Sequence, residues 1–287
     1  MKVIGTGKHT RLCDCFCTAL CGFQCFVFFV KSPASAATCL SSFAKTASAF
    51  GLQVSWPKTK TQNLGSGSQP DTISVNGNHV DAAFDFVYLG SSQSSDGQCR
   101  QDIRRHIGFA SAIMSSLDNI WKDKRLSLSI KLRVYLALVQ SVLLYASETW
   151  TLTVADSKTL DAFHMKCQRR ILGISWHQFV RNEEIAARTG LPSLSTTISC
   201  RRSAIFGHLA RLGDEVPAHK ALHSCIRLSQ GRFADPTWKR RPGRSRGRWI
   251  DQLRRDNNRS PADQWKLAIK HGHRGRATLR SNDYATT

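Results

Sequence analysis

Apolar residues recur at intervals of three and four over the middle of the chain. The first stripe consists of Ile103, Ile107, Ala110, Ile113, Met114 and Leu117. A second consists of Leu132, Tyr135, Leu136, Val139, Val142, Leu143 and Tyr145, and a third of Leu160, Phe163, Cys167, Ile171 and Leu172. This spacing places each set on one face of an α-helix. The pattern therefore predicts amphipathic helices that pack into a bundle.

Shorter patterns before residue 100 predict one helix and several strands. Residues 38–52 have helical spacing and end at Gly51, a residue that commonly stops helices. Predicted strands are Phe26–Val30, Ile73–Val75 before the Asn76-Gly77 turn, and a pair within Val80–Leu89. We therefore expect a mainly α fold with a small β hairpin or sheet near residues 52–90.

Charge is concentrated after residue 98. The chain carries 41 Lys and Arg against 20 Asp and Glu, a net charge of +21. Residues 1–98 contribute 7 basic and 5 acidic side chains, and residues 99–287 contribute 34 and 15. Such an excess favours a polyanionic partner, either RNA or DNA, contacted mainly through the phosphate backbone. An acidic membrane surface is the weaker alternative, and no small-molecule substrate is expected.

The most basic stretch is residues 232–259, with 10 Lys and Arg against 3 Asp. Arg244, Arg246 and Arg248 lie among Pro and Gly residues, and Trp249 follows them. This composition predicts a disordered basic segment near 232–248, with Trp249 offering a face for stacking on bases. The same residues could instead act as a nuclear localisation signal.

The N-terminal 39 residues differ from the rest and contain six of the ten cysteines. Lys2, Lys8 and Arg11 precede an apolar run, a layout that resembles a secretory signal. We favour a nuclear or cytoplasmic location over secretion. The cysteine spacing fits no standard zinc pattern, so no metal is predicted there. We expect these residues to pack poorly.

Several strings together resemble reverse transcriptases of non-LTR (LINE-type) retrotransposons. Phe86-x-Tyr88-Leu89-Gly90 resembles the primer-grip hairpin, which leads into a helical thumb. Leu144–Leu152 and Arg169–Trp176 resemble runs of the thumb region, and Ile205–Arg211 and Gly243–Asp251 resemble later parts of the same proteins. The resemblance covers roughly residues 40–281. It implies a palm end, a helical thumb-like bundle and a basic C-terminal region.

The resemblance and the charge together indicate which residues bind nucleic acid. Tyr88 and Leu89 would lie against a primer strand, although plain hairpin core is an equal alternative. Lys58 corresponds to a residue near nucleotide phosphates in the family, or else is a solvated turn residue. Exposed helix faces are expected to carry Arg104, Arg105 and Lys131 toward a duplex backbone.

The chain departs from the family at the catalytic centre. Gln24 and Cys25 fall where the two adjacent aspartates would lie, and Asp14 is the one carboxylate before Asp71. Two-metal phosphoryl transfer needs several converging carboxylates. We therefore expect no catalytic residues, metal ligands or cofactor in this chain, whereas the intact family uses magnesium for RNA-directed DNA synthesis.

Residues 182–212 predict a helix, a turn at Gly190 and a second, basic helix. Arg201 and Arg202 of this second helix are further candidates for binding nucleic acid. A helix-turn-helix DNA reader has this layout, and so does any helical hairpin, which we favour.

The expected organisation is an atypical N-terminus at 1–39, a palm remnant at 40–98, a thumb-like bundle at 99–178, a helical hairpin region at 179–230 and a basic region at 231–287. The predicted function is nonspecific nucleic-acid binding by a reverse transcriptase fragment without its own polymerase site. The alternatives are a helix-turn-helix protein, or a reading frame with no selected function.

Overall fold

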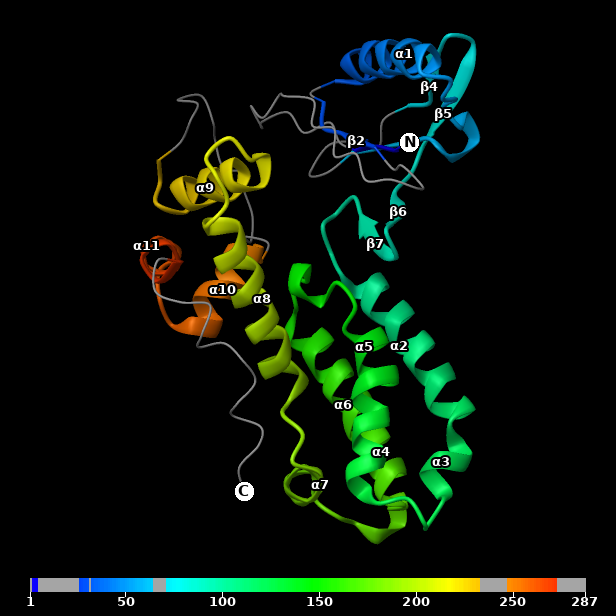
Figure 1. Cartoon of the computed structure of the whole chain (residues 1–287), viewed down its shortest axis with the longest axis vertical. Helices are drawn as coiled ribbons and strands as arrows, with labels where there is room; N and C mark the ends of the chain where they lie inside the picture. Colours follow the sequence, from blue (N-terminus) through cyan, green and yellow to red (C-terminus); the bar gives the residue numbers. More distant parts are fainter. Residues whose placement is uncertain (1, 5–25, 31, 64–70, 233–246, 273–287) are drawn as a thin grey trace. The chain divides into compact units, whose positions relative to one another are not determined.

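The computed structural model describes residues 2–4, 26–30, 32–63, 71–232 and 247–272. The chain separates into two compact units, Met1–His106 and Ile107–Thr287. The described part is mainly α-helical with small sheets, as the sequence predicts (Figure 1). The predicted disordered segment falls largely on residues 233–246, which lie outside the described residues. The domain boundaries expected at 39, 178 and 230 stay predictions.

The first unit packs one helix, α1 (Pro33–Ala49), against a sheet of order β2-β1-β3-β5-β4. The strands are β1 (Lys2–Ile4), β2 (Val27–Phe28), β3 (Lys60–Gln62), β4 (Ile73–Val75) and β5 (Asn78–Ala82), with the 3₁₀ turn η1 (Trp56–Lys58) before β3. Neighbouring strands are parallel except for β4 and β5, which are antiparallel. The sheet therefore joins segments that lie far apart in the sequence.

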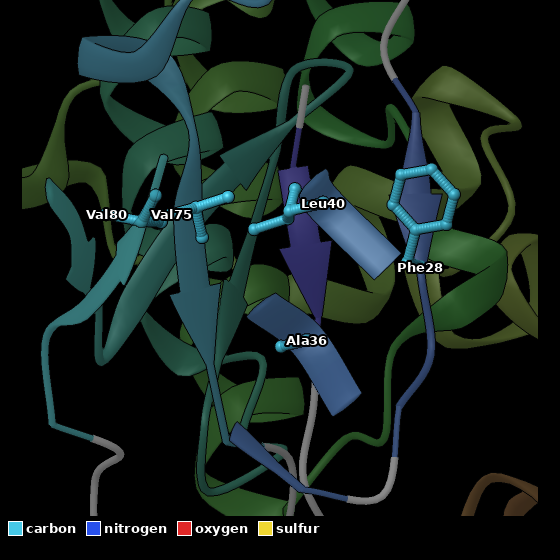
Figure 2. Packing of buried hydrophobic residues seen from close by; sticks show 5 residues of the cluster. All are labelled: Phe28, Ala36, Leu40, Val75 and Val80. Atoms are coloured by element: carbon cyan, nitrogen blue, oxygen red, sulfur yellow. The ribbon is translucent and has the colours of Figure 1, made fainter. Parts of the chain in front are cut away.

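The core of this unit lies between α1 and the sheet. Figure 2 shows Ala36 and Leu40 of α1 lying among Phe28, Val75 and Val80, all of which are buried. The expectation that residues 1–39 pack poorly is therefore wrong for Phe28 and Ala36, because α1 begins at Pro33, contains Ala36 and covers Phe28. Phe50, the C-cap residue of α1, is 78% exposed because the helix ends there.

Local signals set the ends of these elements. The Ser32 hydroxyl accepts a hydrogen bond from the Ser35 amide at 3.1 Å and caps α1, and Gly51 at φ +71° ends it as predicted. Asn76 and Gly77 have φ values of 52° and 78°, the left-handed turn that joins two antiparallel strands. The predicted strand Ile73–Val75 and the turn at Asn76-Gly77 are confirmed. The two strands predicted within Val80–Leu89 do not pair with each other, because β5 pairs with β3 and β4 whereas residues 85–88 pair with residues 91–94.

A second hairpin precedes the helical unit. It consists of β6 (Asp85–Tyr88) and β7 (Ser91–Ser94), with Tyr88 paired to Ser91. Leu89 and Gly90 form the turn, with φ values of 46° and 87°. Helix α2 (Arg100–Ser116) follows, begins in the first unit and continues into the second.

The second unit is helical. Its elements are α3 (Asp118–Lys122), α4 (Leu128–Val134), the π-helical turn η2 (Tyr135–Gln140), α5 (Ser141–Leu143), the 3₁₀ turn η3 (Ser147–Thr149), α6 (Val154–Leu172), the 3₁₀ turn η4 (Trp176–Gln178), α7 (Asn182–Thr189), α8 (Leu194–Ala210), α9 (Pro217–Ser229), α10 (Trp249–Asn257) and α11 (Pro261–Gly272). Helix α8 contacts η3, α6, α9, α10 and α11, so it is the central helix of this region (Figure 1). Phe206 of α8 belongs to an apolar cluster with Leu222, Ile226, Ile250 and Leu253.

Candidate nucleic-acid interface

Side chains of α8 and α10 hold the backbone of residues 144–152, one of the strings that resemble the retrotransposon family. The four donors and their carbonyl acceptors are Arg201 Nη1 to Leu144 (2.5 Å), Arg202 Nη2 to Trp150 (3.2 Å), Trp249 Nε1 to Glu148 (2.7 Å) and Gln252 Nε2 to Leu152 (2.7 Å). A buried carbonyl without a donor is costly, so these bonds fix the path of a segment that has little regular structure of its own.

Three residues that were predicted to bind nucleic acid therefore make contacts within the protein. They are Arg201, Arg202 and Trp249. Arg202 is 2% exposed and also forms an ion pair with Asp256. Trp249 is half-buried and lies 6.5 Å from the Phe206 ring, measured between centroids. Arg202 is therefore not presented to solvent as the sequence analysis expected, and Trp249 is only partly so, because both side chains reach from α8 and α10 to residues 144–152.

Lys131 is a second residue whose predicted exposure is wrong. The helical pattern placed it on an exposed face, but its residue is only 8% exposed and its Nζ donates to the Trp121 carbonyl at 2.8 Å. The aliphatic stem is covered by protein and the ammonium group satisfies the end of α3. Its role in the structure is to join α3 and α4.

Tyr88, Leu89 and Arg105 are brought together at the β6–β7 turn. Arg105 Nη1 donates to the Gly90 carbonyl at 2.9 Å, which ties α2 to the turn, and the Arg105 side chain is 30% exposed. Leu89 is 63% exposed and Tyr88 is half-buried. The turn is thus an apolar projection supported from α2, and the proposed primer contact there stays a prediction.

Asp102 is a residue that sequence reasoning missed. It is 1% exposed and accepts from the Ser92 amide at 2.6 Å and from the Ser91 hydroxyl at 3.0 Å. His106 Nε2 lies 3.4 Å from the same carboxylate. A charged residue in the first turn of an amphipathic helix gives no signal of burial, since its partners come from a strand ten residues earlier.

The remaining Lys and Arg residues that were predicted to bind nucleic acid differ in their exposure to solvent. Lys58 and Arg104 are exposed, in η1 and α2 respectively. Arg248 is exposed but forms an ion pair with Asp251 at 2.9 Å, and hydrogen bonding to that guanidinium lowers the pKa of the Asp251 carboxyl. Arg244 and Arg246 lie outside the described residues.

Exposed cations that the sequence analysis did not select are numerous in the second unit. They include Lys158, Lys166, Arg181, Arg211, Lys220, Arg227, Arg254, Arg255, Arg259, Lys266 and Lys270. Exposed acidic residues in the described part of this unit are fewer: Glu183, Glu184, Asp214, Glu215, Asp256 and Asp263. This difference gives the helical unit a positive surface suited to a polyanion.

One helix presents two cations and a histidine in a row. Lys220, His223 and Arg227 of α9 are exposed and spaced by three and four residues, so they share a face. We call these three residues the α9 ridge. At a rise of about 1.5 Å per residue, the ridge extends over roughly 10 Å of the helix. It can contact more than one phosphate of a strand.

The described ranges contain neither a candidate metal centre nor a helix suited to a membrane. No three His, Cys, Asp or Glu side chains there lie close enough together to hold a metal ion. Among the helices that the structure describes, none is both long and apolar enough to span a bilayer.

Comparison with known proteins found a distant relative. The chain is 24% identical over 273 residues to a transposon-derived protein of Caenorhabditis elegans, and the match covers 89% of this chain and 92% of the relative. No family model and no solved structure matches the chain. The homology supports a transposon origin for this chain.

Proposed function

From this transposon origin we propose that the chain is a fragment of a non-LTR retrotransposon reverse transcriptase that binds the RNA or DNA backbone without sequence preference. The observation that carries the proposal is the surface of the helical unit, where exposed Lys and Arg outnumber exposed Asp and Glu among the described residues. Contacts to phosphate supply most nonspecific affinity for nucleic acids. The nucleus or the cytoplasm is the proposed location.

The resemblance to the retrotransposon family supports the more specific part of the proposal, namely that the chain derives from a reverse transcriptase. The β6–β7 hairpin followed by α2 matches the expected order of a primer-grip hairpin and a thumb, and residues 144–152 lie at the centre of the helical unit. This agreement supports the thumb-like assignment. We further propose that the 287-residue chain does not polymerise by itself, because Asp14 is the one carboxylate before Asp71.

The helix-turn-helix alternative has less support. The helix–turn–helix α7–α8 does form, with Gly190 at φ 64°. However, α8 contacts five other elements, and its exposed stripe of Thr196, Cys200, Ala204 and His208 contains no Lys, Arg, Asn or Gln. A recognition helix uses such side chains on its free face to read base edges in the major groove.

The test is binding to a labelled RNA–DNA primer-template across a salt series, with primer extension in magnesium measured in parallel. We expect affinity to fall steeply with salt, without extension. The variant Lys220→Gln/Arg227→Gln should weaken binding and reduce the slope of log K against log salt by about 1–2.

A matched control removes the same charge elsewhere. Lys122→Gln/Arg125→Gln replaces two exposed cations that already pair with Asp118 and Asp123, so it should change the slope less. Absence of binding at low salt would refute the binding proposal. Extension by protein free of contaminating polymerase would refute the lack of polymerisation.

A further inference from the structure

Phe179 is the most exposed large hydrophobic residue in the described part of the chain, at 84%. It lies between η4 and α7 with φ 51° and ψ 30°, a left-handed conformation that is uncommon for a bulky residue. Hydrophobic side chains are scattered singly on most protein surfaces, so exposure alone indicates little. The surroundings of Phe179 decide what its ring can do.

The backbone on both sides of Phe179 is held in place. The Gln178 amide donates to the Ser175 carbonyl at 3.1 Å, and the Ser175 amide donates to Gln178 Oε1 at 3.0 Å. On the other side, Arg169 Nη2 donates to the Val180 carbonyl at 2.9 Å and to Asn182 Oδ1 at 2.9 Å. The ring is therefore presented from a loop with fixed ends.

An open groove adjoins this loop. It has a volume of about 430 Å³ and is lined by Lys158, Asp161, Ala162, Met165, Arg169 and Asn182. Arg169 and Asn182 belong both to the groove lining and to the hydrogen bonds that hold Val180. The loop that carries Phe179 therefore borders the groove, whose lining comes from α6 and the start of α7.

The charges of this surface are mixed. Lys158 and Arg181 are exposed cations, while Asp161 and Glu183 are acidic, and burial raises the pKa of the Asp161 carboxyl. A surface that tracks only phosphates would be uniformly basic, as the α9 ridge is. An aromatic ring beside a groove with cations, a carboxyl and an amide instead suits a nucleobase and its adjoining phosphate.

We propose that Phe179 stacks on one unpaired base of a bound RNA or DNA strand, with the α6–α7 groove taking the edge of that base and Arg181 or Lys158 contacting its phosphate. The inference rests on the proposed nucleic-acid binding and makes it more specific. The strand must be single at this point, because in a duplex the neighbouring pairs cover both faces of every base.

The experiment compares the full-length chain with Phe179→Ala and Phe179→Trp. The probes are a labelled 12-nucleotide oligouridylate, the corresponding oligoadenylate and a 12-base-pair duplex at one salt concentration. Phe179→Ala should weaken binding of the single strands by about 5- to 100-fold and leave duplex binding unchanged. Phe179→Trp should retain the single-strand affinity, and its fluorescence should be quenched by the bound strand.

Phe50→Ala is the matched control. Phe50 is 78% exposed at the end of α1, in the first unit, and its removal should leave affinity for all three probes unchanged. Thermal unfolding of each variant checks that the fold persists, as expected for exposed side chains.

The outcomes separate this inference from the broader proposal. If the wild-type chain binds none of the probes, nucleic-acid binding fails and the stacking inference fails with it. If the wild type binds but Phe179→Ala binds single strands equally well, only the stacking inference is refuted. Equal losses for single strands and duplex would also refute it, because they would indicate an effect on the whole surface.

Discussion

Arg202 illustrates how a cation in a basic protein can serve the fold alone. Its guanidinium is 2% exposed, pairs with Asp256 of α10 and donates to the Trp150 carbonyl. Lys131 is used in the same manner at the Trp121 carbonyl. In both cases the positive charge lies inside the protein and contributes little to the local contact surface for a polyanion.

Replacing Arg202 tests this structural role. Arg202→Ala removes a fully buried side chain and leaves the Trp150 carbonyl without this donor, so it should lower the free energy of unfolding by about 1–3 kcal/mol, measured by urea denaturation. Arg254→Ala, which removes an exposed cation of the same helix as Asp256, should change it by less than about 0.5 kcal/mol. Similar stability losses for the two variants would contradict the structural assignment of Arg202.

His164 predicts a dependence of stability on pH. Burial lowers the pKa of His164 to about 4, and the nearby Pro192 backbone opposes this shift. His164 Nδ1 lies 2.7 Å from Tyr135 Oη, which suits a neutral ring that accepts from the hydroxyl. Between about pH 6.5 and pH 4 the unfolded chain therefore binds the proton and the folded chain does not.

Because the unfolded state binds more protons in this window, the free energy of unfolding should fall as pH is lowered from about 6.5 to 4. The loss attributable to His164 is on the order of 3 kcal/mol. The free energy of unfolding of wild type and His164→Gln is measured by denaturation at several pH values. The contribution of His164 is the difference between the two proteins in how steeply this free energy changes with pH. Identical slopes would show that His164 does not cause the effect.

At the scale of elements, side-chain hydrogen bonds join pieces that lie apart in the sequence. The β6–β7 hairpin is tied to α2 through Asp102, and residues 144–152 are tied to α8 and α10 through four donors. Two-stranded hairpins are marginally stable alone. Their position therefore depends on these polar connections.

Asp102→Ala should loosen the hairpin. The substitution leaves the Ser92 amide and the Ser91 hydroxyl without their acceptor in a buried place, at a cost of about 1–3 kcal/mol. Hydrogen exchange at the Ser92 amide should accelerate by roughly tenfold or more. Arg104→Ala, which removes an exposed side chain from the same helix as Asp102, is the control and should leave that exchange unchanged. Unchanged protection in Asp102→Ala would mean that other contacts hold β7.

At the scale of the molecule, charge is distributed unevenly between the parts of the chain, and this asymmetry predicts binding without sequence preference. The sequence preference is measured by competition between two duplexes of equal length, one of which has the scrambled sequence of the other. We expect their affinities to differ by far less than about a thousandfold, the minimum typical of specific readers. A preference above that value would favour the helix-turn-helix alternative.

The sequence by itself determined the features that depend on local pattern. Apolar residues at helical spacing predicted the main helices, Asn76-Gly77 predicted the turn between β4 and β5, and the distribution of Lys and Arg predicted a basic second half. These features follow from neighbouring residues along the chain, so no knowledge of distant contacts is needed.

Tertiary structure decided which cations remain accessible. Arg202 and Lys131 look the same in sequence as Lys220 and Arg227, yet the first two are buried against distant carbonyls and the last two are exposed. The accessibility of Phe179 and the burial of Asp102 were likewise invisible to periodicity. The physical reason is that burial and hydrogen bonding depend on segments tens of residues away, whose positions only the folded chain defines.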